Sequence, residues 1–206
     1  TKEPKLLFAI LVTKMFLKNK SNFIHEKSHI SESSKIGKGC YIGANVAIEE
    51  NVTIGENVCI HSNVTIKEDT IINNNVIIEA GTVIGAVGFG YVKDDQLGVF
   101  NFPHIGGVIL EDSVEIGANN TIARGALSNT IIREGVKTDS LVHIAHNVVV
   151  GKRTFIMANA MISGSVKIGT DCWIAPSSCI KDGLKIGNNS TVGIGAVVTK
   201  NIPDRE

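Results

Sequence analysis

Two histidines that lie close together in the chain are the residues best suited to acid–base chemistry. His143 and His146 occur in the stretch DSLVHIAHNV, residues 139–148, on either side of Ile144. A free imidazole has a pKa near ~6.5, so a neutral histidine accepts a proton readily at neutral pH. One of the two is therefore a candidate general base. The spacing alone is also compatible with two exposed side chains at a turn.

Gly164 adds a second group to this candidate site. It lies 18 residues after His146, within the sequence ISGS. If the chain repeats its path every 18 residues, the N–H of Gly164 lies beside the imidazole. A base next to an amide donor is the pair needed to transfer an acyl group onto an amine, because the amide stabilises the developing oxyanion. The chemistry thus depends on elements that impose this period.

A six-residue repeat supplies that period. Every sixth residue from 24 to 84 is isoleucine, and aliphatic residues resume at the same spacing over 110–122 and 132–198, where Thr138 is the one exception. Small or branched residues often lie two positions earlier, which is the alternation of a strand face. Glycine and asparagine commonly follow the aliphatic position and favour turns. Hexapeptide periods of this kind are typical of parallel β-helices.

The repeat predicts an all-β fold, a parallel β-helix over residues 23–203 with three hexapeptides per coil. We expect residues 1–22 to form an amphipathic helical segment, the end of a missing N-terminal domain, that covers the first coil. The repeat breaks at 85–107, a glycine- and aromatic-rich insertion that predicts a projecting loop or hairpin. His104 lies in this insertion, with nothing in the sequence to fix its geometry. A second irregularity, at 128–131, predicts a bulge at one corner.

Composition narrows the classes of function. The 20 basic and 20 acidic side chains balance, which argues against a nucleic-acid partner. The longest apolar run is far shorter than the ~20 residues of a membrane-spanning helix, so we expect no transmembrane segment. Four scattered cysteines favour a reduced, cytoplasmic protein. The zinc-like pattern HExxH at 25–29 falls in the strand repeat rather than on a helix, so we expect no metal there.

Several motifs resemble those of the lipid A enzyme family UDP-3-O-(3-hydroxyacyl)glucosamine N-acyltransferase, within the hexapeptide-repeat acyltransferases. They are FPHIG at 102–106, VEIGAN at 114–119, RGAL at 124–127, GVK at 135–137 and IAHNV at 144–148. The segment GFGY at 88–91 is similar to the insertion loop of that family, and Pro4 to Leu11 to its helix. The resemblance implies a left-handed β-helix and a homotrimer with active sites between subunits.

The resemblance also implies roles for particular residues. His146 would be the general base, the Gly164 N–H would bind the oxyanion, and Asp139 matches a nearby acid of the family. Substrate contacts would come from Asn147, Phe89, Tyr91 and His143. The family carries a second histidine where this chain has Gly183. The stretch 193–203 resembles instead the end of coenzyme A-dependent sugar acetyltransferases, which implies that Gly195 and Lys200 lie along the coenzyme.

These expectations define an N-acyltransferase that uses no tightly bound cofactor and no metal. Its acyl donor is acyl-CoA or acyl carrier protein, and its acceptor is the amine of a nucleotide-activated amino sugar used in lipid A or surface-polysaccharide synthesis. Two alternatives from other classes stay open. One is a metal hydratase of the γ-carbonic anhydrase type, which needs three converging imidazoles. The other is a non-catalytic β-helical scaffold.

Overall fold

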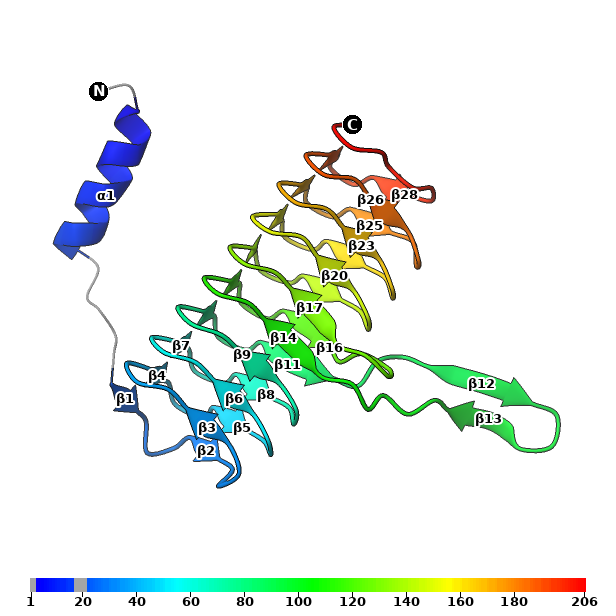
Figure 1. Cartoon of the computed structure of the whole chain (residues 1–206), viewed down its shortest axis with the longest axis horizontal. Coiled ribbons are helices and arrows are strands. Elements are labelled where there is room, and N and C mark those ends of the chain that lie inside the picture. The colour runs from blue at the N-terminus through cyan, green and yellow to red at the C-terminus, as the bar shows by residue number, and fades with distance from the viewer. Residues whose placement is uncertain (1–2, 17–21) are drawn as a thin grey trace.

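The computed structural model describes residues 3–16 and 22–206, and the second range winds into a three-sided parallel β-helix (Figure 1). Strands one coil apart pair in parallel with a register shift of 18 residues, as between Ile42 and Ile60 and between Ile144 and Ile162. The predicted all-β fold built from hexapeptide repeats is confirmed.

Each coil contributes one short strand to each of three parallel sheets, which we call sheets A, B and C. Sheet A contains β1 (Phe23–Ile24), β4 (Tyr41–Ile42), β7 (Cys59–Ile60), β10 (Ile77–Ile78), β15 (Glu115–Ile116), β18 (Lys137–Thr138), β21 (Phe155–Ile156), β24 (Trp173–Ile174) and β27 (Thr191–Val192). Sheet B contains β2 (His29–Ile30), β5 (Ala47–Ile48), β8 (Thr65–Ile66), β11 (Val83–Ala86), β16 (Thr121–Ala123), β19 (His143–Ile144), β22 (Met161–Ile162), β25 (Cys179–Ile180) and β28 (Val197–Val198). Sheet C contains β3 (Lys35–Ile36), β6 (Thr53–Ile54), β9 (Ile71–Ile72), β14 (Val108–Leu110), β17 (Thr130–Ile132), β20 (Val149–Val150), β23 (Lys167–Ile168) and β26 (Lys185–Ile186).

The core is a column of stacked aliphatic side chains inside the prism. The second residue of most strands points inward and is buried, and Ile48, Ile66 and Ile144 are 0% exposed. Turn residues at the corners adopt positive φ, for example Asn45 (57°) and Asn63 (62°). Asparagine tolerates this left-handed conformation better than most side chains, so the sequence repeat places turns where the prism needs corners.

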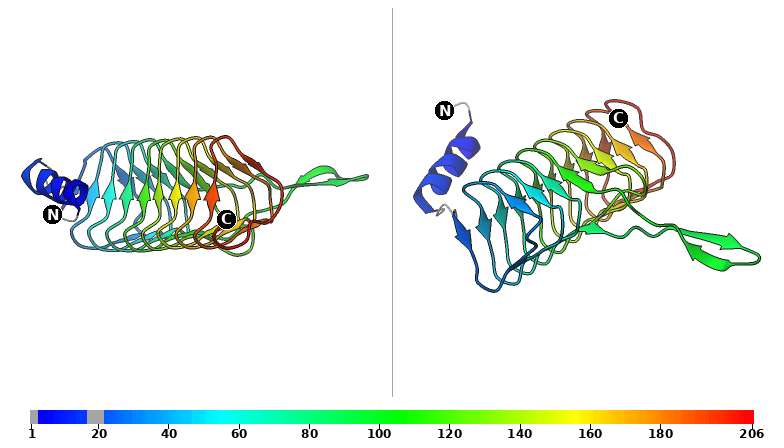
Figure 2. Two further views of the ribbon diagram at one scale, coloured as in Figure 1. Left: turned by 90° about the horizontal axis from the view of Figure 1, so that it is seen from above. Right: turned by 60° about the horizontal axis from the view of Figure 1, so that its bottom comes forward.

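The insertion leaves the prism at the corner that connects sheet B to sheet C, which we call the B–C corner. It contains an antiparallel hairpin, β12 (Tyr91–Asp94) and β13 (Gly98–Asn101), that projects from the column in every view (Figures 1 and 2). All eight hairpin residues are exposed. The next coil is also widened at this corner, by a bend over residues 126–128. Both predicted irregularities are therefore present, and they meet at the same corner.

The N-terminal helix forms as predicted, but neither its contacts nor its pattern of apolar residues matches the prediction. Helix α1 (Pro4–Phe16) has no buried residue, and Phe23 and Ile24 of the first coil are 46% and 53% exposed. The prediction that this helix covers the first coil is wrong. The prediction that it is amphipathic is also wrong, because large apolar residues occupy nearly every position from Leu6 to Val12 and leave no polar face. The division of the chain at residue 22 stays a prediction.

Two sequence expectations about special segments can be compared with the structure. The HExxH stretch at 25–29 runs through a turn into strand β2, so its two imidazoles do not share a helical face. Within the described ranges, no helix is both long enough and apolar enough to pass through a bilayer.

Candidate active site

His146 follows β19 at the B–C corner, and the next side chain along the chain holds its ring. The Nδ1 atom of His146 lies 3.0 Å from Oδ1 of Asn147, and the same Oδ1 accepts the N–H of Ala126 at 3.0 Å. Because Oδ1 can only accept, the Nδ1 of His146 carries the proton. In the neutral imidazole this leaves a free lone pair on Nε2, which is what a general base needs.

Asn147 is itself held by several bonds. Its Nδ2 group donates to the carbonyl oxygen and the hydroxyl of Ser128, at 3.2 and 3.0 Å, and its backbone N–H donates to Oγ1 of Thr130 at 2.9 Å. Its backbone has φ of 60°, as the corner requires. Every polar atom of the side chain is thus engaged within the chain. Within the chain, the Asn147 side chain therefore lies against the ring of His146, and its predicted contact with substrate stays a prediction.

Gly164 lies against the imidazole, one coil after His146. A Cβ atom built on Gly164 would be 2.7 Å from both Cε1 and Nε2 of His146, which is closer than such atoms approach in real structures. The φ of Gly164 is not in the left-handed region, so the absence of a side chain makes room for the ring and is not needed for the backbone path. The sequence spacing of 18 therefore brings the two residues together as predicted.

The N–H of Gly164 has no hydrogen-bond acceptor among the described residues. At the equivalent coil position elsewhere, two residues after the inward side chain, the N–H often binds a side-chain oxygen. Asn74 donates to Asp112 at 2.8 Å, and Asn188 donates to Asp204 at 2.8 Å. Since this backbone position binds carboxylate oxygens at other corners, the free N–H of Gly164 is suited to a negatively charged oxygen.

A pocket of about 430 Å³ opens beside these groups, between the insertion and sheet B. Its lining residues are Ala86, Val87, Gly88, Phe89, Thr121, Ala123, His143, Ala145, His146, Met161, Ser163 and Gly164. Most of this surface is apolar, with the imidazole of His146 at one side. Burial lowers the pKa of His143, so that ring is neutral at pH 7 and adds no charge.

The other predicted substrate residues lie at different distances from this pocket. Phe89 and His143 line it, whereas Tyr91 does not. Tyr91 is in the exposed hairpin, and its ring packs edge-on against Phe89 with centroids 5.0 Å apart.

Asp139 lies at a different corner, the one that connects sheet A to sheet B. It is exposed, and its carboxylate accepts the N–H of Ser140 at 2.7 Å, while its carbonyl accepts Nδ2 of Asn120 at 2.9 Å. Within one chain the structure does not bring Asp139 to His146. Its predicted place in the site stays a prediction.

Gly195 and Lys200, the two residues expected along coenzyme A, lie at separate corners of the last coils. Gly195 is an exposed turn residue with φ of 65° at the corner between β27 and β28. Lys200 is exposed at the B–C corner, three coils after His146, which places it roughly 14 Å along the column from the base. The structure thus aligns Lys200 with the candidate site and not Gly195.

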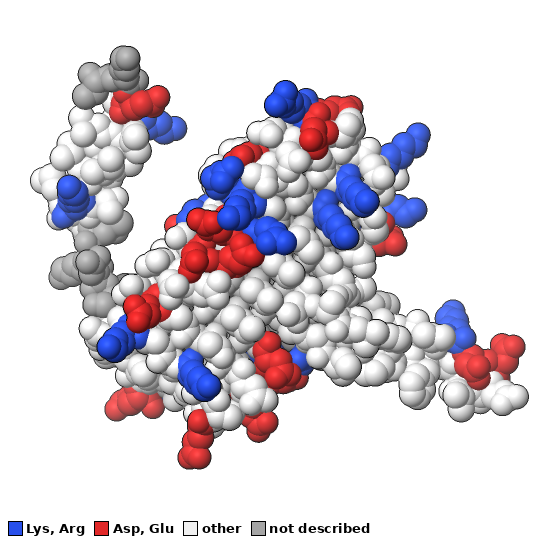
Figure 3. Space-filling model, in the orientation of Figure 1, with Lys and Arg blue, Asp and Glu red and all other residues white. Residues whose placement is uncertain are grey.

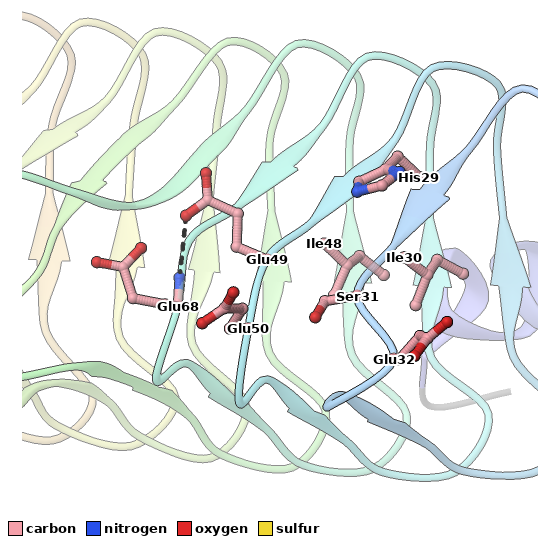
Figure 4. A pocket seen from close by; sticks show the side chains of 8 residues that line it. All are labelled: His29, Ile30, Ser31, Glu32, Ile48, Glu49, Glu50 and Glu68. Carbon is pink, nitrogen blue, oxygen red and sulfur yellow. Dashed lines mark hydrogen bonds between the residues drawn. The ribbon is translucent and has the colours of Figure 1, made fainter.

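A second hollow on the B–C corner is acidic. It has a volume of about 640 Å³ and is lined by His29, Ile30, Ser31, Glu32, Ile48, Glu49, Glu50 and Glu68 (Figure 4). Glu49 forms an ion pair with Lys67 and accepts the N–H of Glu68 at 3.4 Å. None of the predicted site residues lies in this hollow, and its carboxylates repel anionic ligands.

The surface near the insertion carries little charge. On the face drawn in Figure 3, lysine and arginine side chains gather over the last coils, and a largely uncharged surface extends from the middle of the column toward the hairpin, whose tip is charged. Exposed apolar hairpin residues account for part of it, including Val92 (53%), Leu97 (74%) and Val99 (65%). On this face, positively charged side chains are therefore concentrated toward the C-terminal end of the column.

Two residues near the site, His104 and Arg124, have no role assigned from the sequence. His104 packs against His146 with ring centroids 5.1 Å apart. Arg124 is 4% exposed and donates from Nε to the carbonyl oxygen of Gly106 at 2.6 Å, at the base of the insertion. The motifs FPHIG and RGAL contain these residues, but no periodic spacing links either one to His146.

The repeats match a known family of sequences. The family described as bacterial transferase hexapeptide (six repeats) matches residues 33–68, 51–86 and 129–164. These ranges lie on both sides of the insertion and include His146 and Gly164.

Curated relatives share the middle of the chain. The UDP-3-O-acylglucosamine N-acyltransferase of Bordetella avium (strain 197N) is 44% identical over 123 residues, which is 58% of this chain and 34% of that protein. The enzyme of the same name from Caulobacter sp. (strain K31) is 40% identical over 124 residues, covering 60% of this chain and 36% of that protein. The chain thus matches about a third of the length of these relatives.

Solved structures share the fold over most of the chain. LpxA from Acinetobacter baumannii has a TM-score of 0.79 and 26% identity, covering 89% of this chain and 69% of that chain. The UDP-N-acetylglucosamine acyltransferase of Francisella novicida has a TM-score of 0.81 and 24% identity, covering 88% and 64%. The chain is therefore a hexapeptide-repeat β-helix similar in sequence and fold to UDP-sugar acyltransferases, which confirms the predicted resemblance to the hexapeptide-repeat acyltransferases.

Proposed function

We propose that this chain is an N-acyltransferase that moves an acyl group from a thioester carrier to the amine of a nucleotide-linked amino sugar, in lipid A or surface-polysaccharide synthesis. One observation carries the proposal. The Nε2 side of His146, a base with a defined tautomer, lies next to the free N–H of Gly164 at the edge of an apolar pocket. The similarity to UDP-3-O-acylglucosamine N-acyltransferases over residues that include this pair supports the substrate class.

The mechanism follows from these two groups. The sugar amine attacks the carbonyl carbon of the thioester, and Nε2 of His146 takes a proton from the amine as the C–N bond forms. The carbonyl oxygen becomes negatively charged and accepts a hydrogen bond from the Gly164 N–H. When the C–S bond breaks, the imidazolium of His146 returns its proton to the departing thiolate. The products are an amide and a free thiol, and the base is regenerated.

Asn147 makes the imidazole a better base at this step. Its Oδ1 accepts the Nδ1–H bond, and that bond strengthens when the ring becomes positively charged. The backbone and Ser128 hydrogen bonds of Asn147 fix this acceptor in place.

The acyl chain and the carrier take up the remaining surfaces in this proposal. The apolar pocket lined by Phe89 and Met161 accommodates the acyl chain. The pantetheine arm, common to coenzyme A and acyl carrier protein, runs along the B–C corner toward Lys200, which meets a phosphate of the donor. Gly195 as a coenzyme A contact, Asp139 as a residue of the site, assembly into a homotrimer and a cytoplasmic location stay predictions.

Product analysis tests the proposal. The chain is incubated with UDP-linked amino sugars that have a free amine and with donors of two classes, acyl-CoA and acyl carrier protein thioesters of short and 3-hydroxy long chains. Mass spectrometry is expected to find an amide product for at least one pair. The product is expected to be lost in His146→Ala and kept in His61→Ala, a control histidine at another corner.

The alternatives give different results. Thioester consumption without an amide product, or equal amide yield in His146→Ala, contradicts the proposed transfer. Hydration of carbon dioxide, or hydrolysis of an ester, that requires added zinc favours the metal hydratase. No turnover with any donor and acceptor favours the scaffold.

A further inference from the structure

His104 brings a second imidazole to the candidate base from a segment far away in the sequence. It comes from the insertion, 42 residues before His146, and is 8% exposed. Its ring meets the ring of His146 edge-on, with an interplanar angle of 71° and centroids 5.1 Å apart. Burying the polar ring atoms of a histidine costs desolvation free energy, so the contact between the two rings must be stabilised by other interactions.

The tautomer of His104 is fixed in the same way as that of His146. Nδ1 of His104 lies 3.0 Å from the carbonyl oxygen of Phe102, which can only accept, so Nδ1 carries the proton. The Phe102 ring also packs edge-on against His104, with centroids 6.2 Å apart. The imidazole of His104 is therefore held on one side by Phe102 of the insertion and meets His146 on another.

Two glycines of the insertion make room for this ring. A Cβ atom built on Gly88 would lie 2.5 Å from Nε2 of His104 and 3.1 Å from Cβ of His146. A Cβ built on Gly90 would lie 2.7 Å from Cε1 of His104. Neither glycine has φ in the left-handed region, so backbone conformation does not require them. The pattern Gly-Phe-Gly at 88–90 is explained by the space that His104 occupies.

Arg124 fixes both ends of the insertion. Its Nε donates to the carbonyl oxygen of Gly106 at 2.6 Å, and its backbone N–H donates to the carbonyl oxygen of Ala86 at 2.9 Å. Its guanidinium also pairs with Glu68 and, at 3.3 Å, with Asp69 of an earlier coil. Because both ends of the segment are tied to the column, His104 has a defined position relative to His146.

We propose that His104 is a positioning residue that keeps the imidazole of His146 in the rotamer that places Nε2 beside Gly164. This inference rests on the proposed function, since it gives His104 a task only if His146 is the base. At the later position where the resemblance puts a second histidine, this chain has Gly183, and a Cβ atom built there has no neighbour within 4 Å. The second imidazole of this site thus comes from the insertion.

Four variants test this role in steady-state kinetics. In His104→Ala the base loses its restraint, so kcat is expected to fall about 10- to 100-fold while KM changes less than about 2-fold. His104→Phe keeps a ring in the same place and is expected to recover most of the lost kcat. Gly88→Ala places a methyl group against the ring of His104 and the Cβ atom of His146, and its kcat is expected to fall as far as that of His104→Ala. Gly193→Ala, where a built Cβ has no neighbour within 4 Å, is the matched control and is expected to match wild type.

The double variant Gly88→Ala/His104→Ala gives the sharpest comparison. Removing the ring of His104 gives the new methyl group space. The kcat of the double variant is therefore expected to equal that of His104→Ala, and the two losses in kcat are not expected to multiply. Multiplicative losses, or a kcat in His104→Ala equal to that of wild type, would overturn the proposal.

A measurement without substrate separates this proposal from the proposed function. Nitrogen-15 NMR of the imidazoles in the substrate-free protein is expected to show His146 with the proton on Nδ1 in wild type. In His104→Ala the ring signals of His146 are expected to shift, and in His61→Ala they are expected to stay. Unchanged His146 signals in His104→Ala would refute the positioning role. If wild type transfers no acyl group at all, the proposed function fails and the spectra still decide whether His104 positions His146.

Discussion

Substituting Gly164 by alanine is the change that probes the candidate site with the least disturbance to the fold. The new Cβ would lie 2.7 Å from Nε2 and Cε1 of His146, about 0.7 Å short of the 3.4 Å at which ordinary contact begins. The backbone at Gly164 has no left-handed φ, so alanine adopts it without strain. The imidazole has an exposed side toward the pocket, so it is the ring that moves.

The expected effect on catalysis follows from this displacement. A shift of about 1 Å in a catalytic group costs on the order of 10²-fold in rate, or about 2.7 kcal/mol in the activation free energy. The N–H of residue 164 is retained, so the loss comes from the base rather than from the oxyanion contact. Stability is expected to stay the same or to rise by up to about 1 kcal/mol, because alanine restricts the unfolded chain more than glycine does.

Thiol release from the acyl donor measures kcat and KM for this variant, and thermal unfolding measures its Tm. Gly193→Ala is the matched control because its built Cβ meets no atom within 4 Å. Gly164→Ala is expected to lose kcat with its Tm intact, and Gly193→Ala is expected to lose neither. Full activity in Gly164→Ala would refute the claim that residue 164 fixes the position of the imidazole.

Three further predictions concern groups around the base. Asn147→Ala removes the acceptor that fixes the tautomer of His146, so kcat is expected to fall about 10- to 100-fold. Asn147→Asp keeps the acceptor and is expected to recover much of this loss. Equal kcat values for the two variants would contradict this role. Burial lowers the pKa of His143, so below pH ~6.5 the unfolded chain binds a proton at this residue that the folded chain does not. The Tm of wild type is therefore expected to fall more between pH 7.5 and pH 5 than the Tm of His143→Gln. Parallel plots of Tm against pH for the two proteins would count against this prediction. Arg124→Met is expected to lower stability by about 1–3 kcal/mol and to speed chymotrypsin cleavage of the insertion. Arg153→Met, which breaks an exposed ion pair, is expected to leave the Tm close to that of wild type. Similar effects of the two substitutions in thermal unfolding and proteolysis would argue against the anchoring role.

The sequence predicts the column and the meeting of His146 with Gly164 because the repeat is strict. Once the inward residues recur every six positions, the coil length of 18 follows, and any two residues 18 apart lie on neighbouring coils. The same arithmetic also separates Asp139 from His146. They are seven residues apart, one hexapeptide and one residue, so they lie at adjacent corners of a coil.

The contacts made by the insertion could not be predicted in this way. His104 and Arg124 belong to segments outside the repeat, so no period relates them to His146. The contact between Asn147 and His146 could not be predicted for a different reason, because an asparagine after a corner histidine is also the ordinary turn residue of this fold. Helix α1 is a further gap, since its apolar residues are exposed in the structure and no sequence period relates it to the column.

Chemical rescue of a variant without the base tests the central claim most directly. In His146→Ala, kcat/KM for amide formation is expected to fall about 10²- to 10⁴-fold, the usual contribution of a general base. Added imidazole, which fits the space left by the side chain beside Gly164, is expected to restore part of the rate in His146→Ala and to leave wild type and His61→Ala unchanged. A His146→Ala protein that forms amide at the wild-type rate without added imidazole would contradict the account.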